Sequence, residues 1–412
     1  MTTPNQEVVK ISFRELVPEI PSTTYATHCI HYYPASFIPQ VVRYCINKFT
    51  NPQDWILDPF AGSGTVGVES FITKRNATLV DINPLTSWFI KAKLLVPQEN
   101  AKFEMEQLLL DSIAYDGKPF VPRWANLRYW HPPVVVNFLT KLWGYFHYEC
   151  DSYLKPLLAF ALLDVTRFLS YADDQVPKLF KSKKKIRKLN RLLKTNWNET
   201  AIKRYKRTAE KYLFASFELK TYVKGEKPSI EVYSPKDIEI WNPTRNYKLV
   251  ITSPPYLQAQ EYIRSSKIDL YWLGYDDKKI RRLSKLEIPY RLPKGKVHTP
   301  TLDLTREKLV KMRRPDLLRL FDSYFYFILT NFLKVSKNIL PEGRLCIFVG
   351  SAKIAGIKVP LWKIIGEYFQ NYGFEVENVL EDKIVSRKLF SYRNNLNPSG
   401  IPSEYLIILK HT

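Results

Sequence analysis

A serine, two prolines and a tyrosine follow a hydrophobic run in "LVITSPPYLQAQEY", which begins at Leu249. Adjacent prolines cannot continue a helix and cannot donate to a sheet ladder, so we expect a strand to end at Thr252. Ser253 and the carbonyl of Pro254 are then two acceptors in a rigid corner, with the ring of Tyr256 beside them. Taken alone, a stiff turn with a tyrosine in the core would explain the same residues.

The same corner has the groups needed to methylate an exocyclic amino group of a nucleobase. That nitrogen is a poor nucleophile because its lone pair is delocalised into the ring. Two acceptors that bind its hydrogens let the nitrogen pyramidalise toward a methyl donor. Because the prolines hold the acceptor carbonyl rigidly, the site needs little reorganisation to reach the transition state. An aromatic ring can stack on a base flipped out of the duplex. The predicted catalytic residues are Ser253, Pro254, Pro255 and Tyr256.

A glycine loop, "DPFAGSGT", lies between a predicted strand and a predicted helix. It lacks the third glycine of the dinucleotide fingerprint and the lysine of a P-loop. Asp58 suits a cationic ligand group, and Asp81 ends the next strand, where an acid binds ribose hydroxyls. Glycine turns are common and Asp81 could simply cap a helix. Their position on consecutive strands favours a nucleoside with a cationic tail and no phosphates, namely S-adenosylmethionine.

The surrounding pattern alternates strand and helix, which is typical of right-handed crossovers in a parallel sheet. We expect strands at 55–57, 77–80, 229–234, 248–253, 344–350, 374–380 and 404–410. The predicted fold is a doubly wound, mostly parallel α/β sheet that ends in a β-hairpin and carries an inserted helical module. The predicted domains are a catalytic domain at 1–94 and 226–412 and an inserted module at 95–225. Residues 1–30 and 274–314 look irregular, and the second of these stretches is basic.

The charge of the chain indicates a polyanionic partner. The net charge is +22, and residues 178–211 carry fourteen Lys or Arg against two Glu. Such concentrated charge favours nucleic acid over a merely solvated helix face, because phosphate contacts release counterions. A membrane surface is less favoured, since no clean apolar face accompanies the charge.

The sequence gives little support for a membrane protein, a disulfide-stabilised protein or a metal-binding protein. There is no apolar run near 18 residues, and the N-terminus "MTTPNQEVVK" has no signal-peptide core. The four cysteines are scattered without a CxxC pair, and the six histidines include no HExxH. We therefore expect a soluble, cytoplasmic protein without a metal.

With these motifs in hand, the sequence resembles the DNA amino-methyltransferases of restriction–modification systems, specifically the cytosine-N4 type. "HYYPASFIPQ", "DPFAGSGT", "VDIN" and "TSPPY" are similar to successive motifs of that family. The resemblance implies a Rossmann-like methyltransferase fold, S-adenosylmethionine, double-stranded DNA as partner, a prokaryotic cytoplasm with association to the nucleoid, and a cognate restriction endonuclease as a candidate partner. It implies cofactor contacts at Tyr33, Pro34, Phe37, Asp58, Pro59, Phe60, Ala61, Gly62, Gly64, Thr65, Asp81, Ile82 and Asn83.

The resemblance says less about which residues bind the target base and the DNA around it. Arg387, Tyr392 and Asn394 are candidates for lining the flipped-base pocket. The insertion lies before the 229–234 strand, whereas many relatives place target recognition after the catalytic motif. We expect the module to read DNA, supported by 274–314, with contacts from Lys183, Lys184, Lys185, Arg187, Lys188, Arg191 and Arg204.

Three alternatives stay open at this point. The target could be adenine N6, because serine at position 253 is a single residue on which to choose the base. The substrate could be an RNA base, since structured RNA also suits a charge of +22. A non-catalytic DNA-binding module with the same fold is the third, and the intact motifs argue against it.

Overall fold

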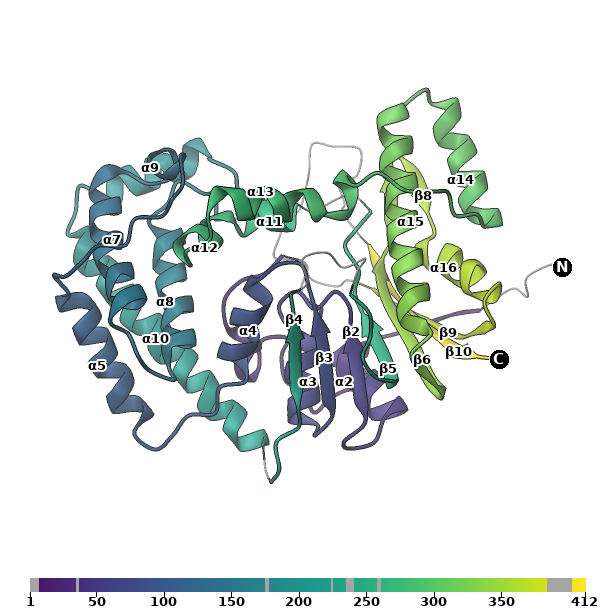
Figure 1. The fold of residues 1–412 in the computed structure, drawn as a ribbon, viewed down its shortest axis with the longest axis horizontal. Coiled ribbons are helices and arrows are strands. Elements are labelled where there is room, and N and C mark those ends of the chain that lie inside the picture. Colours follow the sequence, from purple (N-terminus) through teal and green to yellow (C-terminus); the bar gives the residue numbers. More distant parts are fainter. Residues whose placement is uncertain are drawn as a thin grey trace.

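A sheet flanked by helices forms one part of the molecule, and a bundle of helices packs beside it (Figure 1). The computed structural model describes residues 7–34, 37–174, 178–223, 225–234, 241–257, 261–383 and 402–412. The bundle is the inserted module, and it joins the sheet between the third and fourth strands.

The sheet has eight strands in the order β1-β9-β10-β6-β5-β2-β3-β4. All of its described neighbour pairs are parallel except those of β10 with β6 and β9, which are antiparallel. The predicted doubly wound sheet with a closing β9–β10 hairpin pairing is therefore confirmed. The strands are β1 Val8–Ile11, β2 Trp55–Asp58, β3 Asn76–Val80, β4 Ile230–Tyr233, β5 Tyr247–Thr252, β6 Ile339–Gly350, β9 Phe374–Lys383 and β10 Ser403–His411, and a separate hairpin comprises β7 Ala352–Ile354 and β8 Ile357–Val359.

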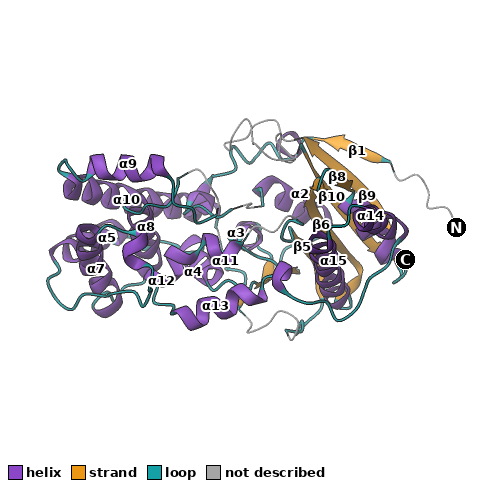
Figure 2. Cartoon of the chain, turned by 90° about the horizontal axis from the view of Figure 1, so that it is seen from above, coloured by secondary structure: helices purple, strands orange, loops and turns teal. Residues whose placement is uncertain are grey.

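Helices cover both faces of this sheet because successive strand residues point to opposite sides. On β6, Leu345 and Ile347 pack with one group of helices, while Cys346 and Phe348 pack with the other. The first group is α14 Pro300–Lys311, α15 Pro315–Ser336 and α16 Leu361–Gln370. The second is α1 Phe13–Leu16, α2 Pro39–Phe49, α3 Thr65–Ile72 and α4 Leu85–Lys93. Figure 2 shows α2 and α15 on opposite sides of the strands.

Two stretches that were expected to be irregular are ordered. Near the N-terminus, β1 pairs with β9, and a 3-10 turn, η1, spans Ala26–Cys29. The basic stretch contains α13 Asp277–Leu286, a 3-10 turn, η2, at Ile288–Tyr290, and α14. The prediction missed α13 because its ten residues are rich in lysine and arginine, and only Ile280 and Leu283 form an apolar stripe. The helix is capped by Asp276, whose Oδ1 accepts from the Lys279 N–H at 2.8 Å.

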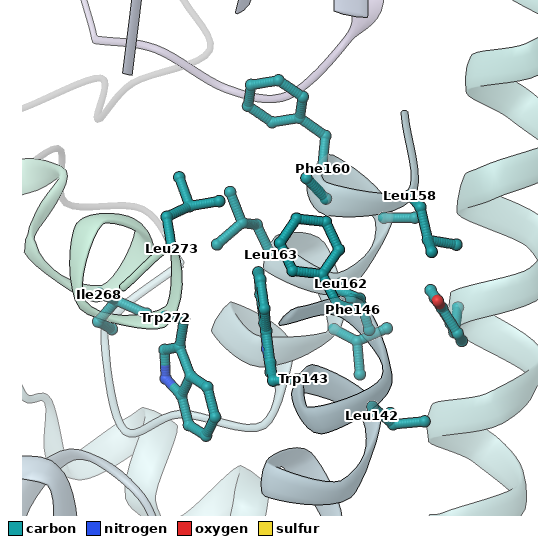
Figure 3. Close-up of a cluster of buried hydrophobic side chains, with 14 of the residues drawn as sticks. Leu142, Trp143, Phe146, Leu158, Phe160, Leu162, Leu163, Ile268, Trp272 and Leu273 are labelled. Carbon is teal, nitrogen blue, oxygen red and sulfur yellow. The ribbon is translucent and has the colours of Figure 1, made fainter. Parts of the chain in front are cut away.

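The inserted helices pack into one hydrophobic core with α4, with the chain around Tyr33 and with the segment after the predicted catalytic motif. The module helices are α5 Ala101–Ala114, α6 Leu127–Trp130, α7 Pro133–Tyr148, α8 Lys155–Phe168, α9 Lys183–Leu192 and α10 Trp197–Tyr222. Short helices α11 Tyr262–Ser265 and α12 Lys267–Trp272 pack into the same core. Figure 3 shows Trp272 beside Trp143 of α7, with their ring centroids 5.9 Å apart. Although α11–α13 belong to 226–412 by sequence, they are packed with the inserted helices.

An ion pair also ties the module to this segment. Arg167 of α8 donates from Nε to Asp269 Oδ1 at 2.7 Å and from Nη2 to Asp269 Oδ2 at 2.8 Å. His31 Nε2 lies 3.4 Å from the same carboxylate. Burial acts to raise the pKa of Asp269, but Arg167 and His31 together hold it down at about 2. The cluster, which we call the Arg167–Asp269 clamp, joins three segments: the module, α12, and the chain leading into the glycine loop.

Candidate active site

The carboxyl ends of β2, β3 and β5 meet at one edge of the sheet. Strand β5 lies beside β2, with Leu249 opposite Ile56 and Val250 opposite Leu57. At the end of these strands, Thr252 Oγ1 donates to Asp58 Oδ1 at 2.7 Å. The glycine-loop motif and the catalytic motif are therefore hydrogen-bonded neighbours, which the sequence argument required.

The glycine loop turns tightly between β2 and α3. Gly62 and Gly64 have φ of 50° and 77°, the left-handed region that favours glycine. A Cβ on Gly62 would lie 3.1 Å from the Tyr33 ring, and a Cβ on Gly64 would lie 2.2 Å from Ile90 Cδ1. The backbone conformation therefore favours glycine at both positions, and a side chain on either residue would also have to displace its neighbour. Thr65, the first residue of α3, donates from Oγ1 to the carbonyl of Phe37 at 3.3 Å.

Asp81 follows β3 and holds this loop. Its Oδ2 accepts from the Gly62 N–H at 2.8 Å, and its Oδ1 accepts from the Asn83 N–H at 2.7 Å. Each carboxylate oxygen can accept a second bond, and the side chain is partly exposed. Asp81 can therefore serve the loop and still accept from a pair of ligand hydroxyls. Burial raises its pKa to about 6.

Asp58 provides a second acid at the same edge. Its residue is 2% exposed, and Oδ1 accepts from the Phe60 N–H at 3.1 Å as well as from Thr252. Among the residues that the structure describes, no donor bonds to Oδ2, so this oxygen keeps its acceptor capacity for a cation. A buried carboxylate beside a glycine turn and a second acid fits a nucleoside with a cationic tail, so the donor set fits S-adenosylmethionine.

The segment before the loop contributes an aromatic wall. Tyr33 and Pro34 are buried, and the Tyr33 ring stacks on Tyr262 with centroids 6.0 Å apart and planes at 20°. The Phe37 ring stacks on Phe348 of the sheet at 5.3 Å. Phe60 likewise packs its ring against Phe332 of α15. Of the remaining predicted cofactor residues, Ala61 and Asn83 are buried and Pro59 and Ile82 flank the two acids.

The corner predicted to be catalytic is formed by Ser253 and the residues after it. Ser253 and Tyr256 are partly exposed, and Pro254 is buried. The Tyr256 hydroxyl donates to Glu404 Oε1 of β10 at 3.2 Å, and the backbone of Tyr256 forms a hydrogen bond with the Tyr262 hydroxyl. These contacts restrain the ring at the carboxyl edge.

Sequence reasoning missed Thr252, Tyr262 and Glu404 as parts of the site. A signal existed for Glu404, because it is a lone carboxylate at the start of an apolar strand, "SEYLIILK". Tyr262 carried no such signal, since its partner Tyr33 is far away in the chain. The predicted pocket residues Arg387, Tyr392 and Asn394 lie outside the described residues.

Cofactor affinity should depend on pH through Asp58. Burial raises the pKa of this carboxyl to about 7, against the opposing effect of the Thr252 hydrogen bond. Below that pH the acid binds a proton and loses the charge that would face a cationic tail. We expect the S-adenosylmethionine affinity to fall about tenfold from pH 8 to pH 6, measured by titration calorimetry.

The matched variant for this prediction is Asp58→Asn, which keeps the shape of the side chain without its titration. It should bind more weakly at pH 8 and show a flatter pH profile than the wild type. Any titration of the ligand itself is common to both proteins. Identical pH profiles would remove Asp58 from cofactor binding.

The basic residues of α9 divide into two groups. Lys184, Arg187, Lys188 and Arg191 are exposed and share one helix face by their spacing. Lys183 is exposed at the start of the helix. Figure 1 shows α9 and α13 on the same side of the molecule, the side on which the strands end. The exposed cations of α13 are Lys278, Lys279, Arg281, Arg282 and Lys285.

Three of the predicted DNA contacts pair with a carboxylate within the module: Lys188, which is exposed and lies 3.7 Å from Asp174 Oδ2, and Lys185 and Arg204, which are held more closely. The Lys185 side chain is 3% exposed and its Nζ lies 2.6 Å from Asp174 Oδ1. Arg204 forms a two-pronged pair with Asp164, with N–O distances of 2.6 and 2.9 Å. This geometry speaks against Lys185 and Arg204 as phosphate contacts, because each would have to give up a carboxylate partner.

The described residues contain neither a membrane-spanning helix nor a metal-binding cluster. Within them, no helix is both long and apolar enough to cross a membrane. The same part of the chain holds no group of three or more His, Cys, Asp or Glu side chains arranged to bind a metal ion.

Comparison with known proteins points to one family. A family model described as a DNA methylase matches residues 5–86, which include the glycine loop and Asp81. The type II methyltransferase M.MvaI of Kocuria varians is 23% identical over 432 residues, covering 95% of this chain and 92% of that protein. M.MjaII of Methanocaldococcus jannaschii is 36% identical over 86 residues, covering 21% of this chain and 16% of that protein. M.BsoBI of Geobacillus stearothermophilus is 23% identical over 277 residues, covering 62% of this chain and 54% of that protein.

These matches confirm the predicted resemblance to the DNA amino-methyltransferases of restriction–modification systems. Methyltransferases of this family use S-adenosylmethionine, so the cofactor prediction is confirmed as well. The choice between an N4 and an N6 amino group lies beyond what the matches specify.

Proposed function

We propose that this relative of the type II methyltransferases transfers the methyl group of S-adenosylmethionine to the N4 amino group of a cytosine in duplex DNA. It would act at a specific site as the modification enzyme of a restriction–modification system, with a cognate endonuclease as its partner. The observation that carries the proposal is the 2.7 Å hydrogen bond from Thr252 to Asp58. It joins the end of the cofactor strand to the residue before the catalytic corner.

The roles of the chain's own groups follow from this geometry. Bound S-adenosylmethionine supplies an activated methyl group. Ser253 Oγ and the Pro254 carbonyl would accept the two hydrogens of the target amino group, which turns its lone pair toward the methyl. Tyr256 would stack on the flipped base, with its hydroxyl anchored by Glu404 at 3.2 Å. The prolines keep the acceptor carbonyl in place between turnovers.

The choice of cytosine rests on Ser253. In the resembling family, serine at this place is usual for the cytosine-N4 type, and an acid or amide is more frequent for adenine N6. Ser253 therefore supports N4, and adenine N6 is the competing outcome of the test below.

Two experiments test the proposal. Labelled methyl transfer in vitro to duplex DNA and to RNA identifies the substrate, and analysis of cellular DNA identifies the base. DNA from a strain expressing the protein would be digested to nucleosides and analysed by mass spectrometry, and modification-sensitive sequencing would give the recognition site. We expect N4-methylcytosine at one recurring site. N6-methyladenine without N4-methylcytosine would contradict the choice of base. Methylation of RNA but not of duplex DNA would contradict the substrate.

The exposed face of α9 should contribute to DNA binding through phosphates. Replacing Lys184, Arg187 and Arg191 with Gln should weaken binding. It should also flatten the slope of log K against log salt by about 0.9 for each phosphate that is no longer neutralised. Fluorescence anisotropy with a labelled duplex at several salt concentrations would measure this slope.

A matched control removes three cations from the opposite edge of the sheet. Lys48, Lys74 and Lys227 are exposed and precede β2, β3 and β4. The triple Gln variant at these positions loses the same charge far from the catalytic corner, so its slope should change little. Equal slopes for both triple variants would show that net charge, and not α9, drives binding.

A further inference from the structure

Lys93, the last residue of α4, is a buried lysine without an acidic partner. Its residue is 2% exposed, and its Nζ donates to the carbonyl of Ser63 at 2.9 Å. The Phe89 ring lies beside the same nitrogen, 5.0 Å from its centroid. Among the described residues, no carboxylate lies within ion-pair distance of Lys93. The amine therefore directs its hydrogen bond to the backbone of the glycine loop.

Such a residue is costly for folding. Burial lowers the pKa of Lys93 to about 7, because the interior disfavours the ammonium form, and the smaller influence of Cys29 acts in the opposite direction. Burying an ionisable group that has no charged partner costs free energy that an apolar side chain of similar length would not cost. The stability of the fold alone thus gives no reason for a lysine here.

The contact that Lys93 makes is with the cofactor loop. Thr86, on the same helix, donates from Oγ1 to the carbonyl of Gly62 at 2.7 Å. Two consecutive carbonyls of the loop are therefore held by α4, while the Gly62 N–H is held by Asp81 at 2.8 Å. Gly62 and Gly64 are free to adopt many backbone conformations, so these outside bonds must select the one that binds.

We propose that Lys93 is a positioning residue for the cofactor: its bond to the Ser63 carbonyl holds the glycine loop in the conformation that accepts S-adenosylmethionine. Lys93 acts from behind the loop and does not touch the reacting atoms. The inference rests on the cofactor role of the loop and is independent of which base is methylated. It explains why a lysine, with a long reach and a strong donor, ends a helix whose other inward residues are mostly apolar.

The substitution Lys93→Met separates positioning from a structural role. The side chain keeps its length and loses its donor. We expect the dissociation constant for S-adenosylmethionine, measured by calorimetry, to rise about tenfold. Turnover at saturating cofactor should stay within about threefold of wild type. The melting temperature of the free protein should stay close to that of wild type, because removing a buried amine offsets the loss of one hydrogen bond to the Ser63 carbonyl.

Two matched variants accompany this test. Lys91→Met changes an exposed lysine on the same helix and should leave cofactor binding unaltered. Thr86→Val removes the other loop bond and should weaken binding in the same direction. If both bonds restrain one loop conformation, the double variant should lose less than the product of the two single effects.

The outcomes are distinct. Unchanged cofactor affinity in Lys93→Met, or a marked fall in its melting temperature, would overturn the inference and make Lys93 a packing residue. Equal weakening in Lys91→Met would also overturn it. Failure of the wild-type protein to bind S-adenosylmethionine would instead overturn the cofactor role of the loop, which is a separate result.

Discussion

Ser253→Ala should lower the turnover number by ~10²-fold or more while the dissociation constant for S-adenosylmethionine stays near that of wild type. The hydroxyl is proposed to accept an amino hydrogen of the target base, and that bond strengthens as the nitrogen pyramidalises. Its loss should thus raise the barrier without affecting the cofactor pocket. Hydrogen bonds hold Asp58 to Thr252 and Asp81 to Gly62, and neither bond involves Ser253.

Single-turnover methyl transfer with enzyme in excess measures this step apart from product release. The matched control is Ser229→Ala, an exposed serine just before β4 at the opposite edge of the sheet. It should transfer methyl groups at the wild-type rate. A wild-type rate in Ser253→Ala would exclude the side chain from the mechanism and leave the Pro254 carbonyl as the acceptor.

Arg167→Met should lower the free energy of unfolding by about 2–3 kcal/mol, less than the ~3–5 kcal/mol typical of removing one partner from a fully buried ion pair, because the Arg167 side chain is 30% exposed. Asp269 has a side chain only 2% exposed, and Arg167 provides two of its bonds. After the substitution, the carboxylate would keep only His31, 3.4 Å away. Urea denaturation followed by circular dichroism gives the free energy.

The module also contains a more solvent-exposed arginine–aspartate pair, which provides a control. Arg204 also forms a two-pronged pair, with Asp164, but its side chain is 43% exposed and that of Asp164 is 24% exposed. Arg204→Met should cost only about 0–1 kcal/mol. The double variant Arg167→Met with Asp269→Leu should recover much of the loss, because no unpaired charge stays buried. Equal losses for Arg167→Met and Arg204→Met would contradict the clamp.

The clamp also connects the parts of the chain that are proposed to bind DNA and the cofactor. It connects the module that carries α9 with α12, which follows the catalytic motif, and with His31, two residues before Tyr33. The described part of the module, together with α11–α13, shares one hydrophobic core with Tyr33 and Phe89. DNA held by the exposed face of α9 would thus be held by a body that also shapes the cofactor wall.

Several features of the site could be predicted from the sequence because they depend on local pattern and on a general property of parallel sheets. A strand that ends in Asp58, a glycine loop, an acid after the next strand and a strand that stops at two prolines are each visible within a few residues. Parallel strands present their carboxyl ends at one edge, so these pieces had to converge once β2 and β5 were neighbours.

Other features required the tertiary structure, since they join residues that no local pattern connects. Arg167 and Asp269 are 102 residues apart, and Tyr256 and Glu404 are 148 apart. The ion pair of Lys185 with Asp174 was equally hidden, because a lysine in a basic run has the same sequence signal whether it points outward or toward a carboxylate. The sequence determined which side chains and turns lie at the ends of the strands, because these depend on short-range periodicity and on turn residues. The packing of helices that are distant in the sequence decided which side chains are paired inside the protein and which are exposed.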